Sequence, residues 1–239
     1  MKGSLGKTCP SLVMVGTVHR DPKGYSKLLR LLDEEHPKVL TVEISRYSRK
    51  FRDQRVPSLR ALLRENLKKI HREKGWPLKK IYSHPAIQSI FFILQEPYEW
   101  RAAARYAAQD RMMIQDVDLS SYSRRKLSCM AELVAKDNLW SLLQTSPIPD
   151  LTRQVEIQYS RANLLMAHPS FIRWETQELK KRELYMAAQI RRFVDRRKKE
   201  KILHIGGWEH LLEFPGEDSL FTLLKDLRPQ RILLPAKTI

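Results

Sequence analysis

At 239 residues, 42% of them hydrophobic, the chain is long enough for one well-buried domain, and this composition excludes a disordered protein. Its longest apolar stretch, at residues 87–94, is far shorter than the roughly 18 residues of a membrane span. Residues 1–7 lack the apolar core of a signal peptide, and two cysteines are too few for a disulfide framework. The formal charge of +17 attracts polyanions without showing that such binding is the function, and we expect a soluble cytoplasmic protein.

Five short apolar runs predict β-strands. Each is too short for a helix, and most are rich in β-branched residues. Between them lie helical patterns, the first at residues 23–35, where leucines share one side and Pro37 follows. This alternation predicts an α/β fold with a mainly parallel central sheet of about five strands and helices on both faces. The predicted strands are Leu12 to Val15, Val39 to Ile44, Met112 to Val117, Ile202 to Ile205 and Arg231 to Leu234.

Two helical insertions interrupt the alternation, at about residues 58–109 and 121–197. Gly75-Trp76-Pro77 predicts a turn within the first, and turn residues at 146–150 and 168–170 break the second. Neither insertion begins or ends at a sharp change of composition. We therefore expect a single domain over residues 1–239, with the insertions forming a cap or the surface of a homodimer.

Two Gly-x-x-His sequences follow the first and fourth predicted strands. They are Gly16-Thr17-Val18-His19 and Gly207-Trp208-Glu209-His210. Glycine lets the chain turn at the end of a strand, and histidine serves as a proton carrier or metal ligand near neutral pH. Because parallel strands end at the same edge of the sheet, where open α/β sheets bind ligands, we expect His19 and His210 to meet there.

Two carboxylates end further strands at the same edge. Asp116 ends the third, and Glu43 interrupts a run whose other members suit a buried strand. A bare buried carboxylate costs several kcal/mol at least, so Glu43 must be paired, protonated or bound to a cation. A plain salt bridge to arginine or lysine is the structural alternative to a functional role.

Two predicted helices bring more charged residues to this edge. A helix over Glu99 to Gln109 would be roughly 15 Å long, close to the length of a strand, so Glu99 and Arg101 would start near the strand ends. The helix at about residues 176–197 carries Arg182 and Glu183 within or beside its apolar stripe. Arg101 and Arg182 are candidates for binding an anion, although arginines that extend from a helix into solvent are equally common.

Taken in order, these motifs resemble those of a known family. They are similar to the TraB/PrgY (pheromone shutdown) proteins and the TIKI metalloproteases, within a wider superfamily that includes the erythromycin esterases and the ChaN haem-binding lipoproteins. Similar proteins also carry an acidic-Arg-acidic turn after the third strand, where this chain has Asp116-Val117-Asp118. The resemblance spans nearly the whole chain and rests on Gly16 to His19, Val42 to Ile44, Tyr98 to Ala103, Arg182 to Met186 and His204 to Leu211.

The resemblance implies a central sheet with an active-site edge. In the TIKI-like branch it also implies metal-dependent peptide hydrolysis through both Gly-x-x-His histidines and a glutamate, here His19, His210 and Glu43. Two neutral imidazoles and a carboxylate would leave an open coordination position, as a catalytic metal requires. Zinc, manganese and cobalt all accept such ligands.

Three functional hypotheses follow. The leading one is a hydrolase in which a divalent metal ion held by His19, His210 and Glu43 activates water against a peptide, amide or ester bond of a peptide or small-molecule substrate. Its metal-free competitor, from the esterase branch, uses a histidine as general base oriented by Glu43. In the third, a non-enzymatic protein binds nucleic acid or another polyanion through its basic surface. In either hydrolase, Glu99, Arg101 and Arg182 complete the predicted catalytic set.

Overall fold

Five parallel strands form one sheet in the order β3-β2-β4-β1-β5. The computed structural model describes residues 12–145, 149–168, 176–197, 200–213 and 218–234. The predicted α/β fold is confirmed, and each predicted strand is present with ends that differ by at most two residues. The strands are β1 (Leu12–Thr17), β2 (Val39–Val42), β3 (Met113–Asp116), β4 (Ile202–Gly207) and β5 (Gln230–Leu233).

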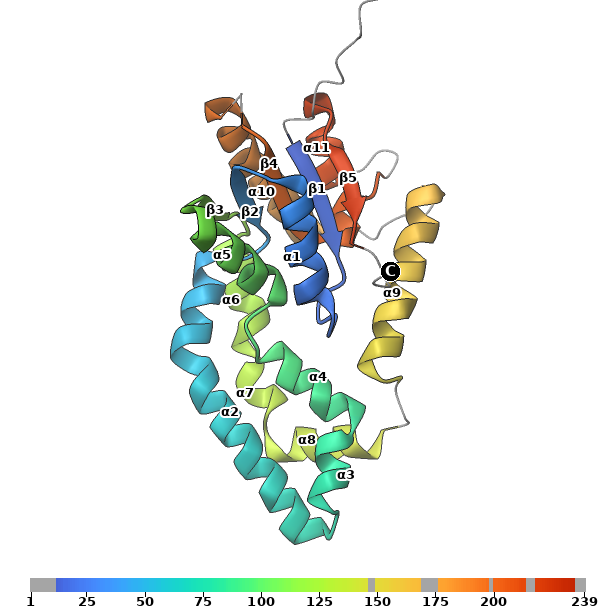
Figure 1. The fold of residues 1–239 in the computed structure, drawn as a ribbon. Helices are drawn as coiled ribbons and strands as arrows, with labels where there is room; N and C mark the ends of the chain where they lie inside the picture. The colour runs from blue at the N-terminus through green and yellow to red at the C-terminus, as the bar shows by residue number, and fades with distance from the viewer. Residues whose placement is uncertain (1–11, 146–148, 169–175, 198–199, 214–217, 235–239) are drawn as a thin grey trace, which may run out of the picture.

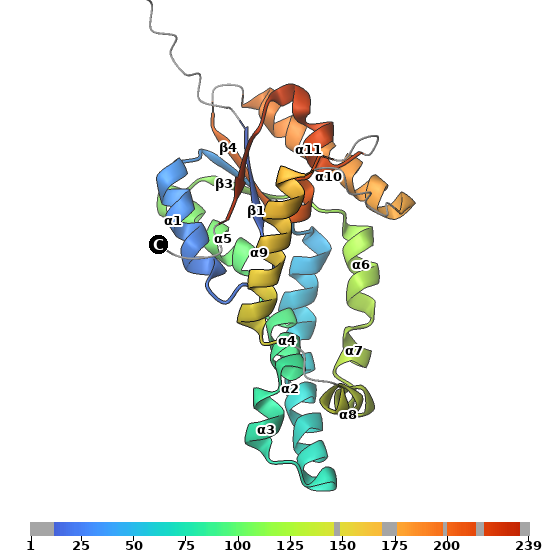
Figure 2. The same ribbon diagram turned by 90° about the vertical axis from the view of Figure 1, so that its right-hand side faces the viewer.

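Helices cover both faces of this sheet, as Figures 1 and 2 show. Alternate strand residues point to opposite faces, so Val13 and Val15 pack with α1 (Gly24–Glu35) and α5 (Tyr98–Asp110). On the other face, Leu12 and Met14 pack under α10 (Gln177–Arg196) and α11 (Leu220–Leu223). Every residue of β1 and β4 is buried, which suits strands in the interior of a parallel sheet.

The first insertion begins earlier than predicted. Helix α2 (Arg46–Lys74) starts well before residue 58, because Ser45 caps it by accepting a hydrogen bond from the Ser48 amide at 3.0 Å. Pro57 lies inside this helix without ending it. The helix stops at Gly75, whose φ of 69° is the left-handed conformation that favours glycine. The predicted turn at Gly75-Trp76-Pro77 is therefore confirmed.

Helices α2, α3 (Leu78–Ser83), α4 (Pro85–Ile93) and α8 (Lys136–Gln144) extend the molecule away from the sheet. In Figure 1, α2 runs from the sheet to the far end of the molecule, where α3 and α8 lie close to it. Leucines and isoleucines from α2, α3, α4 and α8 form a separate apolar core there. The remaining helices are α6 (Ser120–Ser128), α7 (Met130–Leu133), α9 (Leu151–Ala167) and the short 3-10 turns η1 (Trp208–Leu211) and η2 (Lys225–Leu227).

Parts of the predicted breaks at 146–150 and 168–170 lie outside the described residues. Within those residues, no helix combines the length and the apolar character that crossing a membrane would need.

Candidate functional site

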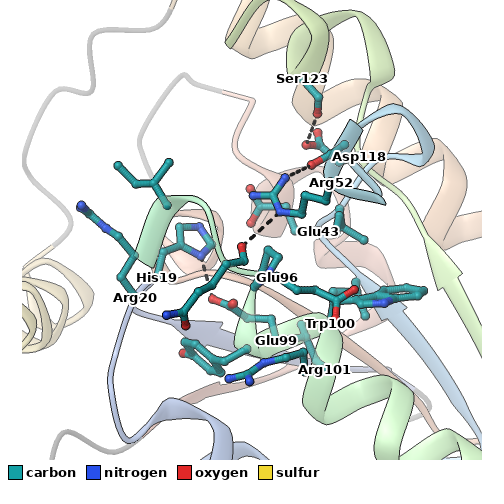
Figure 3. A pocket seen from close by; sticks show the side chains of 18 of the residues that line it. His19, Arg20, Glu43, Arg52, Glu96, Glu99, Trp100, Arg101, Asp118 and Ser123 are labelled. Carbon is teal, nitrogen blue, oxygen red and sulfur yellow. Dashed lines mark hydrogen bonds and ion pairs between the residues drawn. The ribbon is translucent and has the colours of Figure 1, made fainter. Parts of the chain in front are cut away.

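The predicted residues come together at the C-terminal edge of the sheet. His19 follows β1, Glu43 follows β2, and His210 lies in η1 directly after β4. Two cavities of about 400 and 670 Å³ open at this edge. His19, Glu43 and Arg182 line both of them, so these side chains stand where the cavities meet. Figure 3 shows the first cavity.

Glu43 is held by three donors. Arg182 donates from Nη2 to Oε1, and the Gly207 amide donates to Oε2 at 2.6 Å. Nε2 of His210 lies 3.1 Å from the same Oε2. Burial alone would raise the pKa of Glu43, but His210 and Arg182 outweigh that effect and hold this pKa well below its usual range. The salt bridge expected as the structural alternative is therefore present, and Glu43 is ionised.

His210 lies between two carboxylates. Its Nδ1 is 2.8 Å from Oε1 of Glu183, while its Nε2 faces Glu43. Burial lowers the pKa of His210, but Glu43 and Glu183 more than compensate and raise it to about 10. Both ring nitrogens therefore donate, and the side chain is an imidazolium at neutral pH.

The charge on His210 predicts a loss of stability in alkaline solution. A histidine whose pKa is raised by folding stabilises the protein fully below its unfolded pKa, near 6.5, and this stabilisation is lost as pH rises toward about 10. We expect the free energy of unfolding to fall across this window by up to about 1.4 kcal/mol per pH unit. Urea denaturation from pH 6.5 to 10 measures it. A His210→Gln variant lacks this contribution to the slope, and an equal slope in both proteins would contradict the assignment.

Arg182 joins Glu43 to Asp118. Its Nε donates to Oδ1 of Asp118 at 2.7 Å, and Nη2 donates to Oδ2 at 3.0 Å. The structure thus places Asp118, rather than the predicted Asp116, in this network. Asp116 lies 3.6 Å from Arg49 and lines neither of the two cavities. The acidic turn after β3 contains no arginine, but Asp118 forms an ion pair with Arg182 of α10.

His19 and Glu99 form a separate pair. Nδ1 of His19 is 2.8 Å from Oε1 of Glu99, and the Thr17 hydroxyl donates to the same oxygen at 3.0 Å. Figure 3 shows the imidazole facing this carboxylate, which belongs to the first turn of α5. Desolvation lowers the pKa of His19, but Glu99 outweighs it and raises this pKa above 6.5. Since the carboxylate can only accept, Nδ1 carries the proton in the neutral ring and Nε2 has a free lone pair.

The His19 side chain is also accessible. It is 56% exposed, whereas the Glu99 side chain is 6% exposed. A β-carbon added to Gly207 would lie 3.0 Å from Nε2 of His19 and 3.5 Å from Oε2 of Glu43. The lack of a side chain at Gly207 thus leaves the space beside Nε2 open, on the side where Glu43 also lies.

The donor atoms of the predicted metal site are largely engaged with one another. Both nitrogens of His210 face carboxylates, and one oxygen of Glu43 receives the cationic Arg182. Over the described ranges, no group of three or more His, Cys, Asp or Glu side chains is placed to hold a metal ion. The residues as arranged therefore do not fit a shared cation, and coordination by His19, His210 and Glu43 stays a prediction.

Arg101 lies apart from this network, at the cavity wall. It is exposed, it lines the first cavity, and its guanidinium lies 5.2 Å from the centre of the Tyr25 ring. Some residues of the site are absent from the prediction. One is Thr17, which the sequence could have indicated because it lies inside the first Gly-x-x-His sequence, at the end of the strand. Another is Arg52 of α2, which also lines this cavity but is one of many basic residues in its helix, so the sequence does not indicate it.

No family model, curated protein or solved structure matches this chain. The likeness to the TraB/PrgY and TIKI proteins therefore rests on the sequence motifs alone and stays a prediction.

Proposed function

We propose that the protein is a hydrolase of an ester, amide or peptide bond in which His19 is the general base. The observation that carries this proposal is the His19–Glu99 pair, with Nδ1 held by a buried carboxylate and the exposed ring lining two cavities. A base oriented in this way through its other ring nitrogen recurs in hydrolytic sites. Glu99 thus takes the orienting role that the metal-free hypothesis gave to Glu43.

The proposed reaction uses one water molecule. Nε2 of His19 accepts a proton from the water while the water oxygen attacks the carbonyl carbon, and the imidazolium then gives the proton to the departing alcohol or amine. The Glu99 carboxylate stabilises the imidazolium that forms between these steps. Glu43, Arg182 and His210 hold the neighbouring strand ends in place, since Glu43 also binds the Gly207 amide.

Metal removal separates this mechanism from the metal-dependent one. We expect hydrolysis of p-nitrophenyl esters to persist after dialysis against a chelator, because His19 acts on water without a cation. The measurement is the initial rate before and after chelation, with the metal content of the purified protein determined in parallel. A co-purifying metal together with loss of activity on chelation, restored by zinc, manganese or cobalt, would instead favour the metal-dependent hydrolase.

The basic charge of α2 favours polyanion binding as a second candidate function. This helix carries eleven lysines and arginines against three carboxylates. Arg60, Arg64, Lys68 and Arg72 follow one another at four-residue spacing, about 6 Å apart along one side of the helix. Steep weakening of RNA or DNA binding by salt would support this candidate, and weak binding that salt does not change would count against it.

A further inference from the structure

The first cavity has the size and lining of a small-molecule site. It measures about 400 Å³ and lies between the strand ends and helices α2, α4, α5 and α6. Phe92, Ile93 and Trp100 give it an apolar wall, and His19 also lines it. Ligand pockets combine such an apolar lining with a few polar groups that fix the orientation of the ligand. The polar side chains of the cavity therefore indicate the chemical class of its ligand.

The carboxylates of this cavity are mostly neutralised within the protein. Three of the five are engaged by cations: Asp21 by Lys27, and Glu43 and Asp118 by Arg182. A fourth, Glu99, accepts hydrogen bonds from His19 and Thr17. The fifth, Glu96, is exposed at the surface. Two carboxylates, Glu96 and Glu99, are thus left to balance further cations.

Four further cations line the same cavity, and they come from four different segments. They are Arg20 after β1, Arg52 of α2, Arg101 of α5 and Lys126 of α6. Across the ranges that the structure describes, none of the four forms an ion pair with a carboxylate. Segments distant in sequence thus direct excess positive charge at one cavity, which attracts and concentrates anions.

Arg52 is the most firmly placed of these cations. Its Nε donates to the Gln95 carbonyl at 3.3 Å, and Nη1 donates to the Ser48 hydroxyl at 2.7 Å. Its partners are neutral, so burial lowers the pKa of Arg52 even though Glu96 and Glu99 lie near enough to oppose it. A guanidinium that is fixed, partly desolvated and without a bonded carboxylate is prepared for an oxyanion, which it binds through charge-assisted hydrogen bonds.

We propose that the substrate carries an oxyanion, a carboxylate or a phosphate, which Arg52 binds in the first cavity together with Arg101 and Lys126 while the scissile carbonyl lies at His19. The apolar wall packs against the part of the substrate between these two groups. This inference rests on the proposed hydrolase function and specifies its substrate class.

Two esters that differ in one charge test the proposal. We expect a higher kcat/KM for the mono-p-nitrophenyl ester of glutaric acid than for neutral p-nitrophenyl butyrate. Arg52→Gln should lower kcat/KM for the anionic ester about 10- to 100-fold, mainly through KM, because one charge-assisted hydrogen bond is lost. Hydrolysis of the neutral ester should fall much less than hydrolysis of the anionic ester, and Arg52→Lys should restore part of the loss. Arg64→Gln, an exposed arginine of the same helix outside the cavity, is the matched control.

A binding measurement keeps this test independent of catalysis. Calorimetric titration with glutarate and with inorganic phosphate should show binding that Arg52→Gln weakens at least tenfold, and the stronger of the two ligands identifies the oxyanion. Arg52-dependent binding without hydrolysis of either ester would support the anion site and overturn the hydrolase. Equal hydrolysis of both esters, with neither rates nor binding changed by Arg52→Gln, would overturn the anion site alone.

Discussion

Replacing His19 with glutamine is expected to lower kcat/KM for ester hydrolysis by about 100- to 10,000-fold, the usual contribution of a general base. Glutamine keeps much of the size of the imidazole but cannot accept the proton of the attacking water. The fold should be preserved, because the His19 side chain is 56% exposed and belongs to no apolar cluster. Initial rates with a neutral p-nitrophenyl ester measure the effect, and urea denaturation verifies folding. His36→Asn, at an exposed histidine far from both cavities, is the control.

The pH profile adds a signature that a structural role would not produce. General-base catalysis requires neutral His19, so kcat/KM should rise with pH through the pKa of His19, which Glu99 raises above 6.5. In Glu99→Gln the carboxylate charge is lost and this pKa falls, so the rise should move to lower pH while the maximal rate decreases. An unshifted profile in Glu99→Gln, or nearly full activity in His19→Gln, would refute the proposed base.

The fold could be predicted from the sequence because its signals are local. A buried parallel strand such as Leu12–Thr17 is a short run of apolar residues, and the helices between strands show their own periodicity. The sequence does not predict the start of α2, because its first turns contain few apolar residues and the Ser45 cap is a single residue among many polar ones. The arrangement of α2, α3, α4 and α8 into a separate core depends on contacts distant in sequence, which no local pattern specifies.

The sequence predicts which residues gather at the site but not how their side chains pair. Topology alone brings His19, Glu43 and His210 to one edge, since they follow parallel strands. Their pairing depends on side chains from α5 and α10, and neither Glu99 nor Glu183 reveals its histidine partner in the sequence. For the same reason the sequence points to Asp116 at the strand end, whereas Asp118, two residues further along the chain, forms the ion pair with Arg182.

The network around Arg182 differs from an ordinary surface ion pair in its burial. Arg182 and the carboxylates of Glu43 and Asp118 have side chains that are at most 10% exposed, so water solvates none of them well. In this setting the pair itself contributes little net stability, but removing one partner leaves the others charged and desolvated. The arginine is thus the counter-charge on which two buried carboxylates depend. Among the described residues, Glu43 has a second cationic partner in His210, whereas Asp118 has none.

Arg182→Met is therefore expected to destabilise the protein by about 3 to 5 kcal/mol, the usual cost of breaking a buried ion pair from one side. Wild-type Glu43 has a depressed pKa, so its contribution is present above the unfolded pKa and lost only as pH falls through the lower folded value. Without Arg182 the pKa of Glu43 rises, and the deficit relative to wild type should shrink as pH falls from 7 to 4. Urea denaturation across this range measures both effects. Adding Asp118→Asn to Arg182→Met should recover part of the lost free energy of unfolding, since one unpaired charge is then removed. A stability difference from wild type that stays constant with pH and is not reduced by Asp118→Asn would show that Arg182 stabilises the fold through its packing alone.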